Sequence, residues 1–90
     1  MTKLVWDAGF KRSYKKRISG NKLLKAKFHE CLALFSLNPH DARLKTHKLS
    51  GKLNGLWAFS VSYDCRVIFV FIENYKSVLF IDIGTHDEVY

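Results

Sequence analysis

The sequence predicts an α+β domain, and three observations lead to that prediction. Two helical patterns lie between residues 8 and 37, and apolar or alternating segments follow between residues 57 and 83. The third observation is size, because 90 residues of which 48% are hydrophobic suffice for one modest core. We therefore expect a single domain over residues 1–90, with a short N-terminal strand, two helices and a C-terminal antiparallel sheet of three strands.

The first predicted elements are a short strand and a basic helix. Residues 4–6 are apolar, and Asp7 is a suitable N-cap for the helix that follows. Phe10 and Tyr14 form an apolar stripe on that helix, which is otherwise rich in lysine and arginine. The polar residues 19–21 end it.

A second helix is predicted from Lys22 to Leu37, before Asn38 and Pro39 end it. Its apolar residues recur at helical spacing and should face the core: Leu24, Phe28, Cys31, Leu32 and Phe35. His29 lies on the polar side of this period, so we expect it to be exposed and to have no catalytic part.

A polar, basic connection over residues 38–55 leads into the sheet, and connections of this length are usually functional or mobile. Three strands are predicted over residues 57–63, 66–72 and 77–83, with a hairpin turn at residues 73–76. One face of the sheet should pack on the second helix. The other face, which we expect to be open, bears Ser60, Ser62 and Asp64.

The net charge of +7 is unevenly distributed along the chain. Residues 1–55 carry 13 Lys/Arg and 3 Asp/Glu, whereas residues 56–90 carry 2 and 5. A basic half beside a slightly acidic sheet creates a directional field that attracts polyanions, so the pattern favours nucleic-acid binding. The alternative interpretation is that the lysines only solubilise helix surfaces.

Cofactors, metals and membranes are not indicated. Cys31 and Cys65 form no CxxC pair, and the four scattered histidines show no spacing typical of structural zinc. No apolar run approaches the roughly 20 residues of a membrane span, and the N-terminus lacks the apolar segment of a signal peptide. We expect a cytoplasmic protein without a metal, a cofactor or a membrane contact.

Candidate proton-transfer groups lie near the C-terminus and in the basic connection. His86 and Tyr90 stand four residues apart, so one turn of helix would place both side chains on one face. His47 lies in the connection among lysines. These residues suggest a small basic protein that binds nucleic acid and cleaves it.

The order of elements and three segments resemble the RelE/ParE superfamily of bacterial toxins, and most closely its YafQ-like RelE branch. The segments are His-Lys-Leu-Ser-Gly at 47–51, Asp-Cys-Arg-Val-Ile-Phe at 64–69 and Ile-Gly-Thr-His-Asp-Glu-Val-Tyr at 83–90. The resemblance covers essentially the whole chain and implies a RelE-like, microbial-ribonuclease-like fold. It further implies the toxin of a type II toxin–antitoxin pair: a ribosome-dependent, metal-independent endoribonuclease that enters the ribosomal A site, cleaves mRNA and is neutralised by a cognate antitoxin.

The resemblance also implies roles for individual residues. His47 and His86 match catalytic histidines of the YafQ-like branch, and Tyr90 matches an aromatic position that is catalytic or stacks on the substrate. Asp64 matches an acidic residue at the strand junction, and Arg66 matches an arginine at the start of the central strand. The chain departs from the branch at two positions. Ser60 stands where the branch has a histidine, Cys65 stands where it has an aromatic residue, and the RelE-type arginine of that first sheet strand is missing.

Metal-free RNA cleavage needs a base for the 2′-hydroxyl, an acid for the leaving oxygen and cations near the phosphate. His47 and His86 can divide the proton-transfer roles in either order, because histidine has an unperturbed pKa of about 6.5. Tyr90 is suited to base stacking or to orienting a proton-transfer group, and Asp64 to fixing a histidine tautomer or acting as base. The candidates for phosphate binding are Arg43, Lys45, Lys48, Lys52 and Arg66.

Two other functions remain open at this point. One is a non-enzymatic inhibitor of DNA gyrase of the ParE kind, and the other is a basic RNA- or ribosome-binding module without catalysis. The combination of His47, His86 and Tyr90 favours the nuclease, because a gyrase inhibitor has no evident need for proton-transfer groups.

Overall fold

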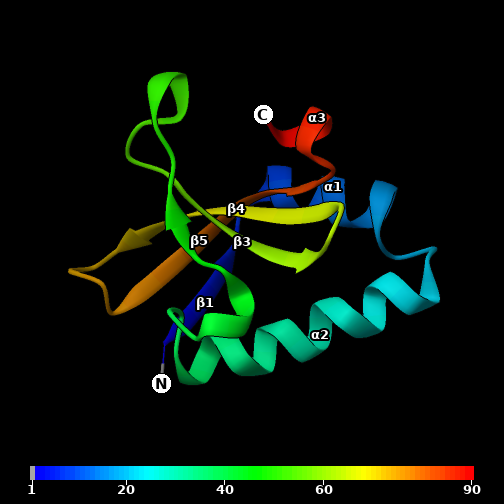
Figure 1. Cartoon of the computed structure of the whole chain (residues 1–90), viewed down its shortest axis with the longest axis horizontal. Helices are drawn as coiled ribbons and strands as arrows, with labels where there is room; N and C mark the ends of the chain where they lie inside the picture. Colours follow the sequence, from blue (N-terminus) through cyan, green and yellow to red (C-terminus); the bar gives the residue numbers. More distant parts are fainter. Residues whose placement is uncertain (1) are drawn as a thin grey trace.

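The structure is a computed structural model that describes residues 2–90 (Figure 1). Its elements in chain order are β1 (Lys3–Trp6), α1 (Ala8–Arg17), α2 (Lys22–Leu37), the 3₁₀ turn η1 (Ala42–Leu44), β2 (His47–Lys48), the 3₁₀ turn η2 (Gly51–Leu53), β3 (Trp57–Ser62), β4 (Cys65–Ile72), β5 (Ser77–Gly84) and α3 (His86–Val89). The α+β class is confirmed, and α2 begins and ends at the predicted residues.

The two long helices are capped as the sequence predicts. The Asp7 carboxylate accepts a hydrogen bond from the Phe10 amide at 2.7 Å and begins α1. The Asn21 side chain accepts one from the Leu24 amide at 3.1 Å and begins α2. Along the predicted apolar stripe of α2, Phe28 is fully buried. Since these apolar residues share one face, that face turns toward the sheet.

The sheet is mixed and has two strands more than the three that the pattern predicted. Its order is β1-β5-β4-β3-β2, with β1 parallel to β5 and the other neighbours antiparallel. The N-terminal strand therefore joins the same sheet, which its four residues alone do not reveal. The predicted connection over 38–55 also contains β2, where His47 pairs with Ala58 and Lys48 pairs with Trp57.

An aromatic core lies between the helices and one face of the sheet. Six phenylalanines are fully buried there and contact one another in edge-on or tilted pairs: Phe10, Phe28, Phe35, Phe59, Phe69 and Phe80. Replacing any one of these side chains with alanine would cost about 3–5 kcal/mol. This core fixes the sheet on which the candidate residues stand.

The second face of the sheet is flanked by two chain segments. In Figure 1 the loop that contains η2 and the short helix α3 both rise on the side of the sheet away from α2. We call residues 45–55 the basic loop and residues 84–90 the C-terminal arm. Ala58 and Ile68 face each other across β3 and β4, and both are buried although they lie outside the main core. No helix within residues 2–90 is long and apolar enough to cross a membrane.

Candidate active site

The C-terminal arm is a capped turn of helix that carries two candidate residues. Thr85 is its N-cap: the Thr85 hydroxyl accepts from the Glu88 amide at 3.3 Å, and the Glu88 carboxylate accepts from the Thr85 amide at 2.7 Å. The rings of His86 and Tyr90 are 4.5 Å apart and edge-on at 84°. The prediction that a helical turn brings these two side chains together is confirmed.

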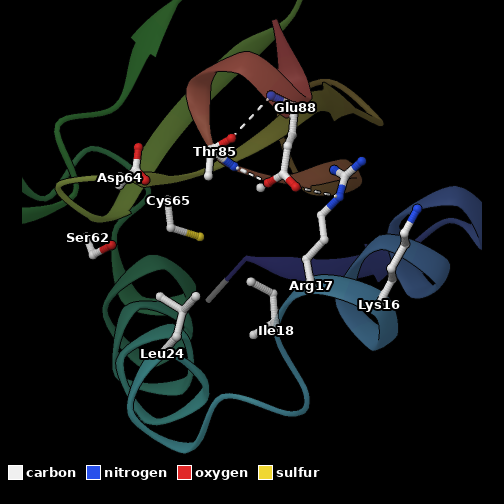
Figure 2. A pocket seen from close by; sticks show the side chains of 10 residues that line it. Lys16, Arg17, Ile18, Leu24, Ser62, Asp64, Cys65, Thr85 and Glu88 are labelled. Carbon is white, nitrogen blue, oxygen red and sulfur yellow. Dashed lines mark hydrogen bonds and ion pairs between the residues drawn. The ribbon is translucent and has the colours of Figure 1, made fainter.

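Arg17 of α1 holds this arm against the sheet (Figure 2). Its Nη1 donates to the Ile83 carbonyl oxygen at 2.9 Å and lies 3.3 Å from Asp82 Oδ1, and its Nε lies 3.5 Å from Glu88 Oε2. The Thr85 amide and the charge of Arg17 lower the pKa of Glu88, so that its carboxylate is charged at neutral pH. We call these contacts the Arg17 network.

Gly84 fits this network only because it has no side chain. A Cβ at this position would stand 2.7 Å from Glu88 Oε1 and 2.8 Å from Arg17 Nη1, closer than such atoms approach. Gly84 is also the register partner of Arg66 in β4. A side chain where the strand passes into the arm would therefore force Arg17 and Glu88 to shift out of this arrangement.

The basic loop positions His47. Its Nδ1 lies 2.9 Å from the Lys45 carbonyl oxygen, which can only accept a hydrogen bond. In the neutral imidazole this contact places the proton on Nδ1 and leaves the lone pair of Nε2 available. Lys45 itself adopts a left-handed conformation with φ 53°, which is uncommon for a residue with a side chain.

The basic loop and the C-terminal arm meet at Tyr90. Tyr90 lines a hollow of about 330 Å³ together with Leu49, Ser50, Lys52 and Leu53. Burial raises the pKa of Tyr90, while the charge of nearby Arg66 opposes the shift, so the phenol keeps its proton at neutral pH. Of the predicted residues, Tyr90, His86 and Lys52 thus lie around one part of the second face.

A second hollow of about 350 Å³ lies beside the free part of β3, beyond the two residues that pair with β2. Its walls include the predicted cations Arg43, Lys45 and Arg66 and the hydroxyl groups of Ser60 and Ser62. We call it the cationic hollow. Ser60 stands where the YafQ-like branch has a histidine. It is the register partner of Arg66, and its small side chain leaves room beside that arginine.

Two predicted residues lie apart from this group. The Lys48 ammonium stands 5.5 Å from the centre of the Trp57 ring, which places it on the opposite side of β2 from His47. Asp64 lies in the β3–β4 turn and lines a separate cavity of about 400 Å³ with Thr85 and Glu88. Ser62, which is two residues from Ser60 on β3, lines both this cavity and the cationic hollow.

That cavity has an apolar base beneath the C-terminal arm, and the Cys65 thiol points into it (Figure 2). Burial, followed by the charges of Glu88 and Asp64, raises the pKa of Cys65 to about 11. The thiol is therefore neutral and behaves as a small apolar group.

The comparison with protein families decides the family. The sequence matches the family described as a bacterial toxin of type II toxin–antitoxin systems, YafQ, over residues 2–90. The chain belongs to this family. The resemblance to RelE/ParE toxins that the three sequence segments indicated is thereby confirmed. No curated protein sequence matches the chain.

Solved structures share the fold of this YafQ-family toxin at low sequence identity. A mutant of YafQ from E. coli is similar over 100% of this chain and 99% of its own, with 20% identity and a TM-score of 0.74. YafQ in the E. coli DinJ–YafQ toxin–antitoxin complex matches over 99% and 97%, also with 20% identity and 0.74. The YoeB/ParE toxin from Agrobacterium tumefaciens matches over 94% and 99%, with 18% identity and 0.78.

The YafQ-family chain holds its C-terminal arm with residues that the sequence analysis did not single out. Arg17 in α1 lies 65 residues before Asp82 in β5 and still further before Glu88 in α3, so no local pattern links it to them. One part of this arrangement has a signal in the sequence: Thr85 followed three residues later by Glu88 is the pattern of a capping box.

Proposed function

We propose that this YafQ-family toxin is an endoribonuclease that cleaves mRNA on the ribosome without a metal ion and thereby inhibits translation. The observation that carries the proposal is the arrangement of the basic loop and the C-terminal arm. His47 stands on the loop and His86 on the arm, the two segments meet where Lys52 lines one hollow with Tyr90, and Arg43, Lys45 and Arg66 line the cationic hollow. Such a set supplies a base, an acid and charge stabilisation for a phosphodiester.

In the proposed reaction the 2′-hydroxyl of the nucleotide 5′ of the cleaved bond attacks the phosphorus. His47 Nε2 takes the hydroxyl proton, because its Nδ1 donates to the Lys45 carbonyl. The bond from phosphorus to the 5′-oxygen breaks, and His86 gives its proton to that oxygen. The products are a 2′,3′-cyclic phosphate and a 5′-hydroxyl.

The surroundings of His86 support its assignment as the acid. Its side chain is largely exposed, so a substrate phosphate can reach it, and its Nδ1 lies 3.6 Å from Asp87 Oδ1. Tyr90 lies against it with a protonated hydroxyl that orients this group or the substrate. Arg66 stabilises the additional negative charge on the phosphate in the transition state.

The proposed partners follow from the family and its relatives. Solved complexes pair E. coli YafQ with DinJ, and relatives from Mycobacterium tuberculosis form the RelBE2 toxin–antitoxin complex. We infer that a cognate antitoxin binds and neutralises this chain. Its substrate is mRNA in the ribosomal A site, which places the protein in the cytoplasm.

A brief pulse of expression followed by mapping of RNA 5′ ends tests the function. The expected result is new 5′-hydroxyl ends within translated codons, at sites that ribosomes occupy. The variant His86→Gln should lower the cleavage rate about 10²–10⁴-fold, the usual contribution of a general acid. His29→Gln is the matched control, because this histidine of α2 is exposed and its side chain hydrogen bonds to Tyr14, outside the proposed site.

Two outcomes would contradict the proposal in different ways. Intact transcripts with blocked DNA gyrase would support a gyrase inhibitor. Intact transcripts with retained ribosome binding would support a binding module without catalysis. Unchanged cleavage by His86→Gln would reject the acid role of that residue alone.

A further inference from the structure

The cationic hollow has the composition of an anion site. It is lined by three cationic side chains and three hydroxyl-bearing side chains: Arg43, Lys45, Arg66, Ser60, Ser62 and Tyr63. No carboxylate is among its walls. Its volume of about 350 Å³ lies within the range of about 300–1,000 Å³ that is usual for small-ligand sites.

Two of its three cations remain available for a ligand. Arg43 is held by a forked contact, with Nε 3.0 Å from Asp41 Oδ1 and Nη2 2.9 Å from Asp41 Oδ2. Hydrogen bonds from Arg43 lower the pKa of Asp41 to about 2, so this pair is fully charged at neutral pH. Among the ion pairs within residues 2–90, none includes Lys45 or Arg66.

The hollow adjoins both parts of the proposed catalytic group. Lys45 lines it with its side chain and holds the His47 imidazole with its carbonyl oxygen. Arg66 lines it and also acts on Tyr90 through its charge. A phosphate bound there would lie next to the one that is cleaved, because successive phosphates of a single strand are neighbours.

Tyr63 stands at the rim of this hollow with its ring almost entirely in solvent. It is 97% exposed, the largest value among the big hydrophobic residues of the described range 2–90, and its ring makes no aromatic pair there. The two other exposed tyrosines have ring partners: Tyr75 packs on Phe71 with ring centres 4.9 Å apart, and Tyr90 packs on His86. An unpaired aromatic face beside cations is the combination that binds single-stranded nucleic acid, since bases stack on it.

We propose that the cationic hollow and Tyr63 form a nucleotide subsite for single-stranded RNA. Lys45 binds the phosphate of a nucleotide that flanks the cleaved bond, while Arg66, on the wall of the same hollow, faces the cleaved phosphate. The base of the flanking nucleotide stacks on the Tyr63 ring. This inference rests on the proposed function and extends it, because it assigns a substrate contact to a residue outside the proton-transfer groups.

The test uses the full chain and a short single-stranded RNA with 2′-O-methyl groups, which lacks the nucleophile and cannot be cleaved. Binding is measured by fluorescence anisotropy. Tyr63→Ala should weaken binding about tenfold, in line with the usual contribution of one stacked base. Tyr63→Phe keeps the ring and should bind like the unaltered protein. Tyr75→Ala is the matched control at the β4–β5 turn and should leave the affinity unchanged.

A second probe series locates the stacked base. Each oligonucleotide carries one abasic position, and at the position that stacks on Tyr63 the effect of Tyr63→Ala should disappear. The proposal is overturned if the unaltered protein does not bind the probe. It is also overturned if Tyr63→Ala binds the probe with the affinity of the unaltered protein, or if Tyr63→Phe binds it as weakly as Tyr63→Ala. Tyr63-dependent binding by a protein that leaves mRNA intact would refute the nuclease and retain the subsite.

Discussion

The basic loop and the C-terminal arm present one histidine each to the same face of the sheet, yet they are held in different ways. The arm is fixed by a capping box and by Arg17, which contacts Asp82, Glu88 and the Ile83 carbonyl. The loop is fixed by the two residue pairs of β2 and by the left-handed turn at Lys45.

The difference separates two uses of charge. In the arm, Arg17 and Glu88 form an ion pair with each other, and this pair holds the arm in place. In the loop, Lys45 and Lys52 take part in no ion pair within residues 2–90 and line open hollows. We expect variants of the Arg17 network to change the rate of cleavage, and variants of the loop lysines to change the affinity for RNA.

Among the variants that test this comparison, the largest effect is expected when the Arg17 network is broken. Arg17→Ala should lower kcat about 10–100-fold with little change in KM, because a misplacement of about 1 Å can cost about 10²-fold in rate. The kcat of Arg17→Lys should lie between those of the unaltered protein and Arg17→Ala, because lysine keeps the charge but lacks the planar guanidinium group. Single-turnover cleavage on purified ribosomes measures the rate, and Arg12→Ala is the control on the same helix. If Arg17→Ala raised KM and left kcat unchanged, Arg17 would be a substrate contact.

A smaller effect is expected in the loop. Replacing Lys45 and Lys52 together by alanine should weaken binding of single-stranded RNA severalfold at low salt. The slope of log affinity against log salt should become shallower by about 1.4, at about 0.7 per lost phosphate contact. Titrations over a range of salt concentrations measure this slope. A parallel shift without a change in slope would show that these lysines do not contact phosphates.

The smallest effect concerns pH. The pKa of Glu88 is lowered in the folded chain, so its contribution to stability is present above the ordinary value of about 4.3 and is lost as pH falls through the lowered one. Between pH 5 and pH 3 we expect faster amide hydrogen exchange in the arm, at a cost below about 1 kcal/mol because Glu88 is partly exposed. Glu88→Gln should remove this pH dependence. The same pH response in that variant would assign it to another carboxylate.

Local patterns allowed most of the fold to be predicted. The helical period and the caps located α1 and α2, and apolar alternation located β3, β4 and β5. The parallel pairing of β1 with β5 was not predicted, because four residues do not specify a partner more than 70 positions away. The two residues of β2 are too short to show any period.

The candidate site also has parts that local patterns predicted and parts that they did not. The contact of His86 with Tyr90 follows from helical spacing, and it is found. Asp64 lies in the turn after β3, where strand alternation no longer applies, so its expected place beside Ser60 stays a prediction. The Arg17 network joins residues that are distant in sequence, and only the folded chain shows it.

Gly84 offers a practical route to an attenuated toxin. An added methyl group at this position would displace Arg17 and Glu88, yet every side chain proposed to touch RNA would keep its identity. A Gly84→Ala protein would therefore serve as a reference for crystallising substrate complexes, in which the histidines are still present and turnover is slowed by geometry alone.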